Sequence, residues 1–263
     1  MLYRKYWLQR GVLAGAFAVL ACLGPVGPAS AQTEGADVNA VDPAATAALN
    51  AMGSYLRGLK AFQVQAQVSS EVVLEDGLKV EHRSQINLLA RLPDRLWAES
   101  VGDIRNRAYF YDGREFTYWA PRYAYYATVP APPTIGKLAD ELQERFGVEV
   151  PLVDLFRWGA PDVKPDPFTV ARDLGPSTVD GVTCSQYAFR QEGLDWQIWI
   201  QRGDYPLPRR LVLTTTDDEA RPQYAATYTW NLAPSYNESS FKFVPPRHAL
   251  KIAMRDVSVE AGK

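Results

Sequence analysis

The stretch FQVQAQVS at residues 62–69 alternates apolar and polar side chains without interruption. A period of two residues places the apolar side chains on one face of a β-strand and the polar ones on the other. Turn-forming residues follow at Glu75-Asp76-Gly77, and residues 79–91 return as a partner strand. The sequence therefore predicts a long β-hairpin with one buried and one solvated face.

The remaining strands are predicted on both sides of a helical region at 134–156. Apolar periodicity and turn residues place them at 95–101, 107–111, 115–119, 123–129, 171–176, 185–191, 194–201, 209–216, 223–232 and 249–257. Asp112-Gly113 is a strong signal for a two-residue hairpin. Most connections are short, whereas parallel strands need crossovers of roughly a dozen residues or more, so we expect antiparallel pairing.

Three amphipathic segments are predicted to be helical. The first follows Asp42-Pro43, which is typical of a helix start, and ends at residues 58–59. The second begins at Thr134 and is closed by Gly147, and a short third lies at 151–156. A sheet of so many strands must curl, and the helices can bury their apolar faces inside the curl. We therefore expect an α+β fold: a curved antiparallel β-sheet, or incomplete β-barrel, with helices covering its concave face.

The first 31 residues have the organisation of an export signal. A basic start precedes an apolar run at 11–23, and Ala29-Ser30-Ala31 offers the small side chains that a signal peptidase accepts. The run is too short for the roughly 20 residues that span a bilayer as a helix. We therefore expect a periplasmic protein with a signal peptide at 1–31, a flexible leader at 32–43, a single half-barrel domain at 44–258 and a tail at 259–263.

The chain has two cysteines, and one of them falls inside the export signal. Cleavage after Ala31 removes Cys22; the alternative is that residues 19–22 form a lipid-attachment box and Cys22 carries a lipid anchor. In either case Cys184 has no partner for an internal disulfide. It follows a turn that leads into a strand, with no histidine near it in sequence, and is expected to be a buried core thiol.

Few residues in this sequence suit catalysis or metal binding. Only His82 and His248 occur, and the sequence contains no HExxH, CxxC, GxSxG or glycine-rich phosphate motif. The formal net charge is −2 and becomes more negative without the basic signal, which disfavours nucleic acid as a partner. We therefore expect no catalytic residue, no metal and no cofactor; an unrecognised hydrolase is the third hypothesis after the two given below.

Aromatic residues make up 12% of the chain and concentrate in the predicted strands. Core packing explains any single one of them. Aromatic walls inside a curled sheet also suit acyl chains, with tyrosine hydroxyls and tryptophan N–H groups available to a polar head. The candidate cavity lining consists of strand aromatics and two leucines of the 134–146 helix: Trp97, Tyr109, Tyr111, Tyr118, Tyr126, Leu138, Leu142, Trp199 and Trp230.

Four stretches of the sequence resemble a family of uncharacterised predicted periplasmic proteins. They are YYATVPAP at 125–132, PLVDL at 151–155, WI at 199–200 with LPRRL at 207–211, and FKFVPP at 241–246. That family is similar in fold to the outer-membrane lipoprotein carrier and its receptor, and the likeness runs from about Ala44 to Val257. The resemblance implies an incomplete antiparallel barrel capped by helices, with a hydrophobic cavity for acyl chains; the same fold also serves a periplasmic regulator.

The sequence therefore favours a non-enzymatic periplasmic binding or carrier protein for a hydrophobic or amphiphilic ligand, such as a lipid or a lipidated protein. The helices at 134–146 and 151–156 are expected to act as a movable lid, and peripheral contact with a membrane is compatible with this role. The alternative is an envelope structural or regulatory module that binds a protein through a strand edge or an aromatic face, its interior filled by its own helices. The sequence leaves the oligomeric state and the identity of the ligand open.

Overall fold

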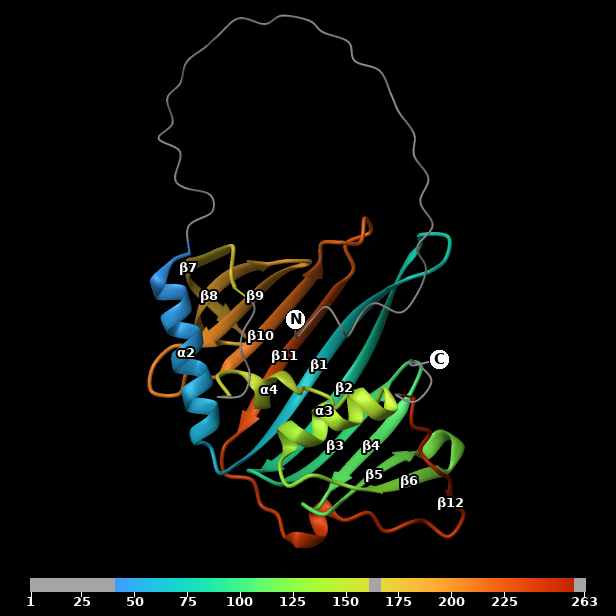
Figure 1. The fold of residues 1–263 in the computed structure, drawn as a ribbon. Helices are drawn as coiled ribbons and strands as arrows, with labels where there is room; N and C mark the ends of the chain where they lie inside the picture. Colours follow the sequence, from blue (N-terminus) through green and yellow to red (C-terminus); the bar gives the residue numbers. More distant parts are fainter. Residues whose placement is uncertain (1–40, 161–166, 258–263) are drawn as a thin grey trace, which may run out of the picture.

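A single sheet dominates the structure, a computed structural model that describes residues 41–160 and 167–257 (Figure 1). Within these residues the strands are β1 (Ala61–Val73), β2 (Lys79–Arg91), β3 (Arg95–Gly102), β4 (Asn106–Tyr111), β5 (Glu115–Ala120), β6 (Tyr125–Pro130), β7 (Val170–Val179), β8 (Val182–Gln191), β9 (Leu194–Gln201), β10 (Pro208–Thr215), β11 (Gln223–Asn231) and β12 (Leu250–Lys251). Their order is β12-β6-β5-β4-β3-β2-β1-β11-β10-β9-β8-β7. Every neighbouring pair is antiparallel except β12 with β6. The curved sheet does not close, which confirms the predicted incomplete barrel.

The alternating stretch at 62–69 lies within β1, at the centre of this sheet. Phe62, Val64 and Ala66 are at most 1% exposed, whereas Gln65 and Gln67 on the other face are exposed. β1 pairs with β2 on one side and with β11 on the other. Since β1 has a neighbouring strand on each side, its apolar face lies in the middle of the concave face of the sheet.

Three α-helices lie against the concave face (Figure 1): α2 (Pro43–Gly58), α3 (Ile135–Phe146) and α4 (Asp154–Arg157), with 3-10 turns at η1 (Pro121–Tyr123) and η2 (Glu238–Phe241). The predicted N-caps are present. The Ala44 N–H donates to the Asp42 carboxylate at 2.8 Å, and the Lys137 N–H donates to Thr134 Oγ1 at 3.3 Å. Gly147 closes α3 with a φ of 62°, a conformation that glycine adopts without strain.

Thr134→Ala is expected to lower the free energy of unfolding by about 1 kcal/mol, because it removes the side-chain acceptor at the start of α3. Urea denaturation followed by circular dichroism measures the loss. Lys137→Ala, an exposed position in the same turn, is the control and should change stability by no more than about 0.5 kcal/mol. Equal effects of the two substitutions would contradict a capping role for Thr134.

One close contact fixes α2 against the chain that follows α4. A Cβ atom at Gly53 would lie 3.0 Å from the carbonyl oxygen of Trp158, so a larger residue would push the two segments apart. Arg57 Nη1 donates to the same carbonyl oxygen at 3.3 Å. Buried residues of α2, α4 and the sheet therefore belong to one core cluster.

The last predicted strand is much shorter than expected. A strand is predicted at 249–257, but only β12 forms there, and it pairs parallel with β6. The Ile252 N–H makes the last hydrogen bond to this edge, to the Tyr126 carbonyl at 2.8 Å. The chain then leaves the sheet, and the Val257 N–H donates to the Arg145 carbonyl on α3 at 2.7 Å. The C-terminal segment thus connects the β6 edge to α3 instead of extending the sheet.

The short helix predicted at 151–156 begins later, at Asp154. Leu152 has a φ of 56°, which lies in the left-handed region and cannot continue a right-handed helix. Its side chain is nevertheless buried, with 7% exposed. The residues before α4 therefore form an irregular segment whose apolar side chains belong to the core.

The predicted terminal segments fall mostly outside the residues that the structure describes. These are the signal peptide at 1–31, the leader at 32–43 except its last three residues, and the tail at 259–263. Within the described residues, no helix is long and apolar enough to cross a membrane.

Candidate ligand-binding cavity

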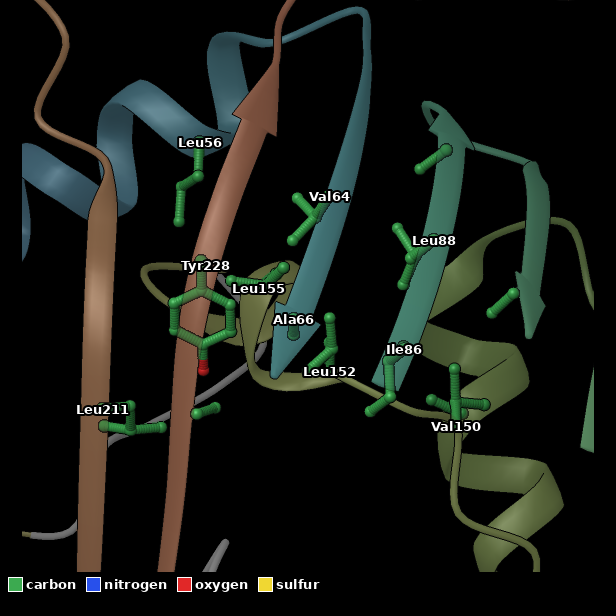
Figure 2. Close-up of a cluster of buried hydrophobic side chains, with 14 of the residues drawn as sticks. Leu56, Val64, Ala66, Ile86, Leu88, Val150, Leu152, Leu155, Leu211 and Tyr228 are labelled. Atoms are coloured by element: carbon green, nitrogen blue, oxygen red, sulfur yellow. The ribbon is translucent and has the colours of Figure 1, made fainter. Parts of the chain in front are cut away.

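A cavity of about 410 Å³ lies between the concave face of the sheet and residues 149–155, here termed the covering segment. The covering segment contains most of the connection between α3 and α4, together with the first two residues of α4. The opposite walls come from β1, β2, β3, β4, β10 and β11, with a contribution from α3. Figure 2 shows Val150, Leu152 and Leu155 of the covering segment lying among side chains of β1, β2 and β11. The cavity is partly open to solvent near the β1–β2 and β3–β4 turns.

The larger part of the cavity wall is apolar. It is formed by side chains that are each at most 8% exposed: Val68, Ile86, Val150, Leu152, Leu155 and Leu213. Burying an apolar group against such a wall gains roughly 25 cal/mol for each Å² removed from water. The strands therefore present a surface that favours an apolar guest over water.

Polarity rises along the concave face toward β4. The strand register places Ile86 of β2 opposite Ser100 of β3, and Ser100 opposite Arg107 of β4. On the other side of β1, Leu213 of β10 lies opposite Tyr224 of β11. The cavity therefore has an apolar end at β10 and β11 and a polar end at β3 and β4.

Arg107 is the half-buried cation at the polar end. Its guanidinium carbon lies 6.0 Å from the centre of the Tyr118 ring, within the range of a cation–π contact. Burial opposes its charge, but Tyr109, Tyr118 and Glu149 together raise its pKa above the ordinary value. Among the described residues no salt bridge reaches Arg107. It is therefore a permanent positive charge that interacts with the Glu149 carboxyl group but forms no salt bridge with it.

Glu149 belongs to the covering segment at the same end of the cavity. The residue is exposed to solvent, but protein atoms surround its carboxyl group closely enough to desolvate it in part. This desolvation raises the pKa of the Glu149 carboxyl group. The Arg107 charge opposes the shift, and the Asp154 carboxylate adds to it. The polar end thus combines a fixed cation with a carboxyl group whose charge is disfavoured.

Two tyrosine hydroxyls add polar atoms to the apolar end. Tyr228 is 4% exposed and Tyr224 is half-buried, and burial raises the pKa of both hydroxyls. Neither hydroxyl has a hydrogen-bond partner among the described residues. Both tyrosines line the cavity, so their hydroxyls can hydrogen-bond to a polar group of a guest.

Ion pairs connect α3 to α4 and to the C-terminal segment. Arg157 of α4, with 7% of its side chain exposed, pairs with Asp140 of α3. Arg145, near the end of α3, pairs with Asp256 of the C-terminal segment at 3.0 Å. If the two helices move as a lid, these ion pairs must either break or move together with the helices. The lid movement stays a prediction.

The structure places five of the nine predicted lining residues on the concave face of the sheet or on the helix above it, but outside the cavity wall. Tyr111 is fully buried and its hydroxyl donates to the Pro132 carbonyl at 2.5 Å. Tyr118 packs edge-on against Tyr109, with ring centres 5.5 Å apart. Leu138 and Leu142 of α3 lie in the core, and so does the partly buried ring of Trp230. Tyr109, which is 2% exposed, is the one member of the predicted set that lines the cavity.

The three remaining candidates lie on the opposite face of the sheet. Trp97 is opposite Phe110 in the register, one position out of phase with the core residues of β3. Tyr126 contacts Phe243 of the C-terminal segment, with ring centres 5.1 Å apart. Trp199 lies under the Arg210 guanidinium, 5.6 Å from ring centre to carbon, beside a second hollow of about 340 Å³. These residues are therefore not brought together with Tyr109.

The sequence analysis did not single out Arg107, Glu149, Tyr224, Tyr228 or the covering-segment leucines. One usable signal was present, because Arg107 lies two residues before Tyr109 and so shares its face of β4. The period of two also relates Tyr224 to Tyr228 on β11. Glu149 belongs to an irregular segment, where no periodicity indicates the direction of a side chain.

Within residues 41–160 and 167–257, no three His, Cys, Asp or Glu side chains are grouped so that they could hold a metal ion. Cys184 is fully buried, and burial raises the pKa of its thiol, which confirms the expectation of a core thiol.

Several solved structures are similar to this chain at low sequence identity. An uncharacterized conserved protein from Thermus thermophilus has 12% identity over 80% of this chain and 99% of its own, with a TM-score of 0.45. LprF from Mycobacterium bovis has 12% identity over 80% and 99%, with a TM-score of 0.41. A LolA superfamily protein from Nitrosomonas europaea has 11% identity over 76% and 97%, with a TM-score of 0.36.

A search of curated protein sequences found no significant match. A protein family described as "Predicted periplasmic protein (DUF2092)" matches residues 45–255, which include almost all of the described fold. The four stretches that carried the family resemblance lie inside the matched region, and the expected periplasmic location agrees with the family description. The chain therefore belongs to this family of predicted periplasmic proteins.

Proposed function

We propose that this protein is a non-enzymatic periplasmic binding protein that holds a hydrophobic or amphiphilic ligand, a lipid or the acyl part of a lipidated protein, in the cavity under the covering segment. The observation that carries the proposal is the cavity itself. Its volume of about 410 Å³ falls within the range of roughly 300–1,000 Å³ that small-molecule sites occupy. Its wall joins buried aliphatic side chains to a few polar groups, as ligand sites usually do.

The hydroxyls of Tyr224 and Tyr228 support the same proposal, because both tyrosines line the cavity. Each hydroxyl can donate a hydrogen bond to a head group or an ester of a bound ligand and can also accept one. The alternative hypothesis of a protein-binding module requires an interior filled by the helices. The space under the covering segment favours ligand binding over that alternative.

The exported protein, purified from its native host without detergent, is expected to carry a lipid that native mass spectrometry detects. The delipidated protein is expected to take up one equivalent of a fluorescent fatty acid. Crosslinking in the periplasm tests the alternative, since a module without a ligand would trap one protein partner instead. Absence of both co-purified lipid and fatty-acid uptake would remove the proposal.

A further inference from the structure

The two ends of the cavity differ in charge. Arg107 lies at the β4 end, and Leu213 with Tyr224 at the β10–β11 end. Between them, Ile86 of β2 and Val68 of β1 are buried apolar side chains of the floor, with Ser100 and Ser84 opposite them in the register. A molecule lying across these strands would therefore meet a half-buried cation at one end, and apolar side chains with a few serine hydroxyls along the rest of its length. At the far end the Asp154 carboxylate acts on Tyr224 and Tyr228, which disfavours a second anionic group there.

Arg107 suits an anionic group better than the other cations near it. Arg83 and Arg105 are exposed at the rim, and Arg157 is already paired with Asp140. Arg107 is half-buried, has no salt bridge among the described residues, and is backed by the Tyr109 hydroxyl. A guanidinium in this state can offer two parallel N–H groups to a carboxylate or a phosphate.

The acidic residues of the cavity lining do not prevent an anionic group from binding at Arg107. Across the whole lining the cations outnumber the anions: Arg83, Arg105, Arg107 and Arg157 against Asp103, Glu149 and Asp154. Of the anions, Glu149 is the one that interacts with Arg107. Its carboxylate would repel an anionic guest, so it should weaken binding without abolishing it.

The volume limits the size of the guest. At about 410 Å³ the cavity lies toward the lower end of the roughly 300–1,000 Å³ that small-molecule sites occupy. It therefore suits a ligand with one acyl chain better than a lipid with two or three.

We propose that the cavity binds a single-chain anionic amphiphile, with the head group against Arg107 and the chain directed across β2 and β1 toward β10 and β11. This inference rests on the proposed function and names its class of ligand. The shared chemistry is an anionic head, which a free fatty acid or an alkyl phosphate can supply.

Calorimetric titration of the delipidated full mature chain with dodecanoate, dodecyl phosphate and dodecanol tests the proposal at neutral pH. Dodecanoate or dodecyl phosphate is expected to bind about tenfold more tightly than dodecanol, because only the anions can make charge-assisted hydrogen bonds to Arg107. The stronger of the two anions identifies the head group. Dimyristoyl phosphatidylglycerol, an anionic lipid with two chains, is expected not to bind.

Arg107→Gln is expected to weaken dodecanoate binding about tenfold while changing dodecanol binding less than about threefold. Glu149→Gln should strengthen dodecanoate binding, because it removes the repelling carboxylate. Arg114→Gln, an exposed position on the β4–β5 turn, is the control and should change neither. If Arg107→Gln does not fold, Arg107→Lys keeps the charge but loses the planar pair of N–H groups, and an intermediate loss is expected.

The outcomes separate this inference from the proposed function. Equal binding of dodecanol and both anions by the unmodified protein would overturn the head-group assignment and leave the proposed function standing. Binding of none of the single-chain ligands would overturn both. Tight binding of the two-chain lipid would overturn the single-chain limit.

Discussion

Val68→Trp is expected to weaken binding of a single-chain amphiphile by about 100-fold, which corresponds to about 2.8 kcal/mol. Val68 projects from β1 into the cavity and is 8% exposed. An indole at this position would occupy the floor between Ile86 and the covering segment, where the chain of the ligand should lie. Because the added volume enters open space and not a packed core, the protein should stay folded.

Gln67→Trp provides the matched control for this substitution. Gln67 is the preceding residue of β1, but it is exposed on the opposite face of the sheet. Fluorescent fatty-acid uptake and calorimetry measure both variants, and circular dichroism reports whether they fold. Unchanged binding by a folded Val68→Trp variant would show that the ligand does not use this cavity.

Phe62→Ala is expected to lower the free energy of unfolding by about 3–5 kcal/mol. Phe62 is 1% exposed at the start of β1. Its ring stacks on Phe156 of α4 with centres 5.8 Å apart, and lies 5.3 Å from the Trp230 ring of β11. Truncation removes the side chain that joins α4 to the two central strands and leaves a cavity in its place.

Urea denaturation measures this loss through the midpoint of unfolding, provided that the slope of the transition is unchanged. Gln65→Ala, an exposed position on the same strand, is the control and should change stability by no more than about 0.5 kcal/mol. A loss below about 1 kcal/mol for Phe62→Ala would mean that α4 is not supported by this aromatic contact. It would then be free to move without disturbing the sheet.

The sheet and its helices could be predicted because their signals are local. The alternation at 62–69 determines which face of β1 is buried, and the caps at Asp42 and Thr134 mark where α2 and α3 begin. The parallel pairing of β12 with β6 could not be predicted. It depends on where the C-terminal segment returns to the sheet, and no short-range pattern encodes that return.

The candidate site could be predicted only in part, and strand geometry explains why. Tyr109 and Tyr126 both lie on strands that carry aromatic residues on both faces, so alternation alone does not tell which face is concave. The register with neighbouring strands resolves this, and it places Tyr109 inside and Tyr126 outside. Arg107 and Glu149 come together only because the covering segment folds back over β4.

The two ends of the open sheet differ in how their free edges are protected. At β6, the two-residue β12 and the Ile252 N–H occupy part of the edge. At β7, Asp42 caps α2 and also accepts a hydrogen bond from the Asp173 N–H at 3.4 Å, next to a register shift before Gly175. Unpaired strand edges attract strands of other molecules, and both devices interrupt the row of free N–H and C=O groups. The protein can thus keep its barrel unclosed, with room for a guest, and still resist edge-to-edge polymerisation in a crowded envelope.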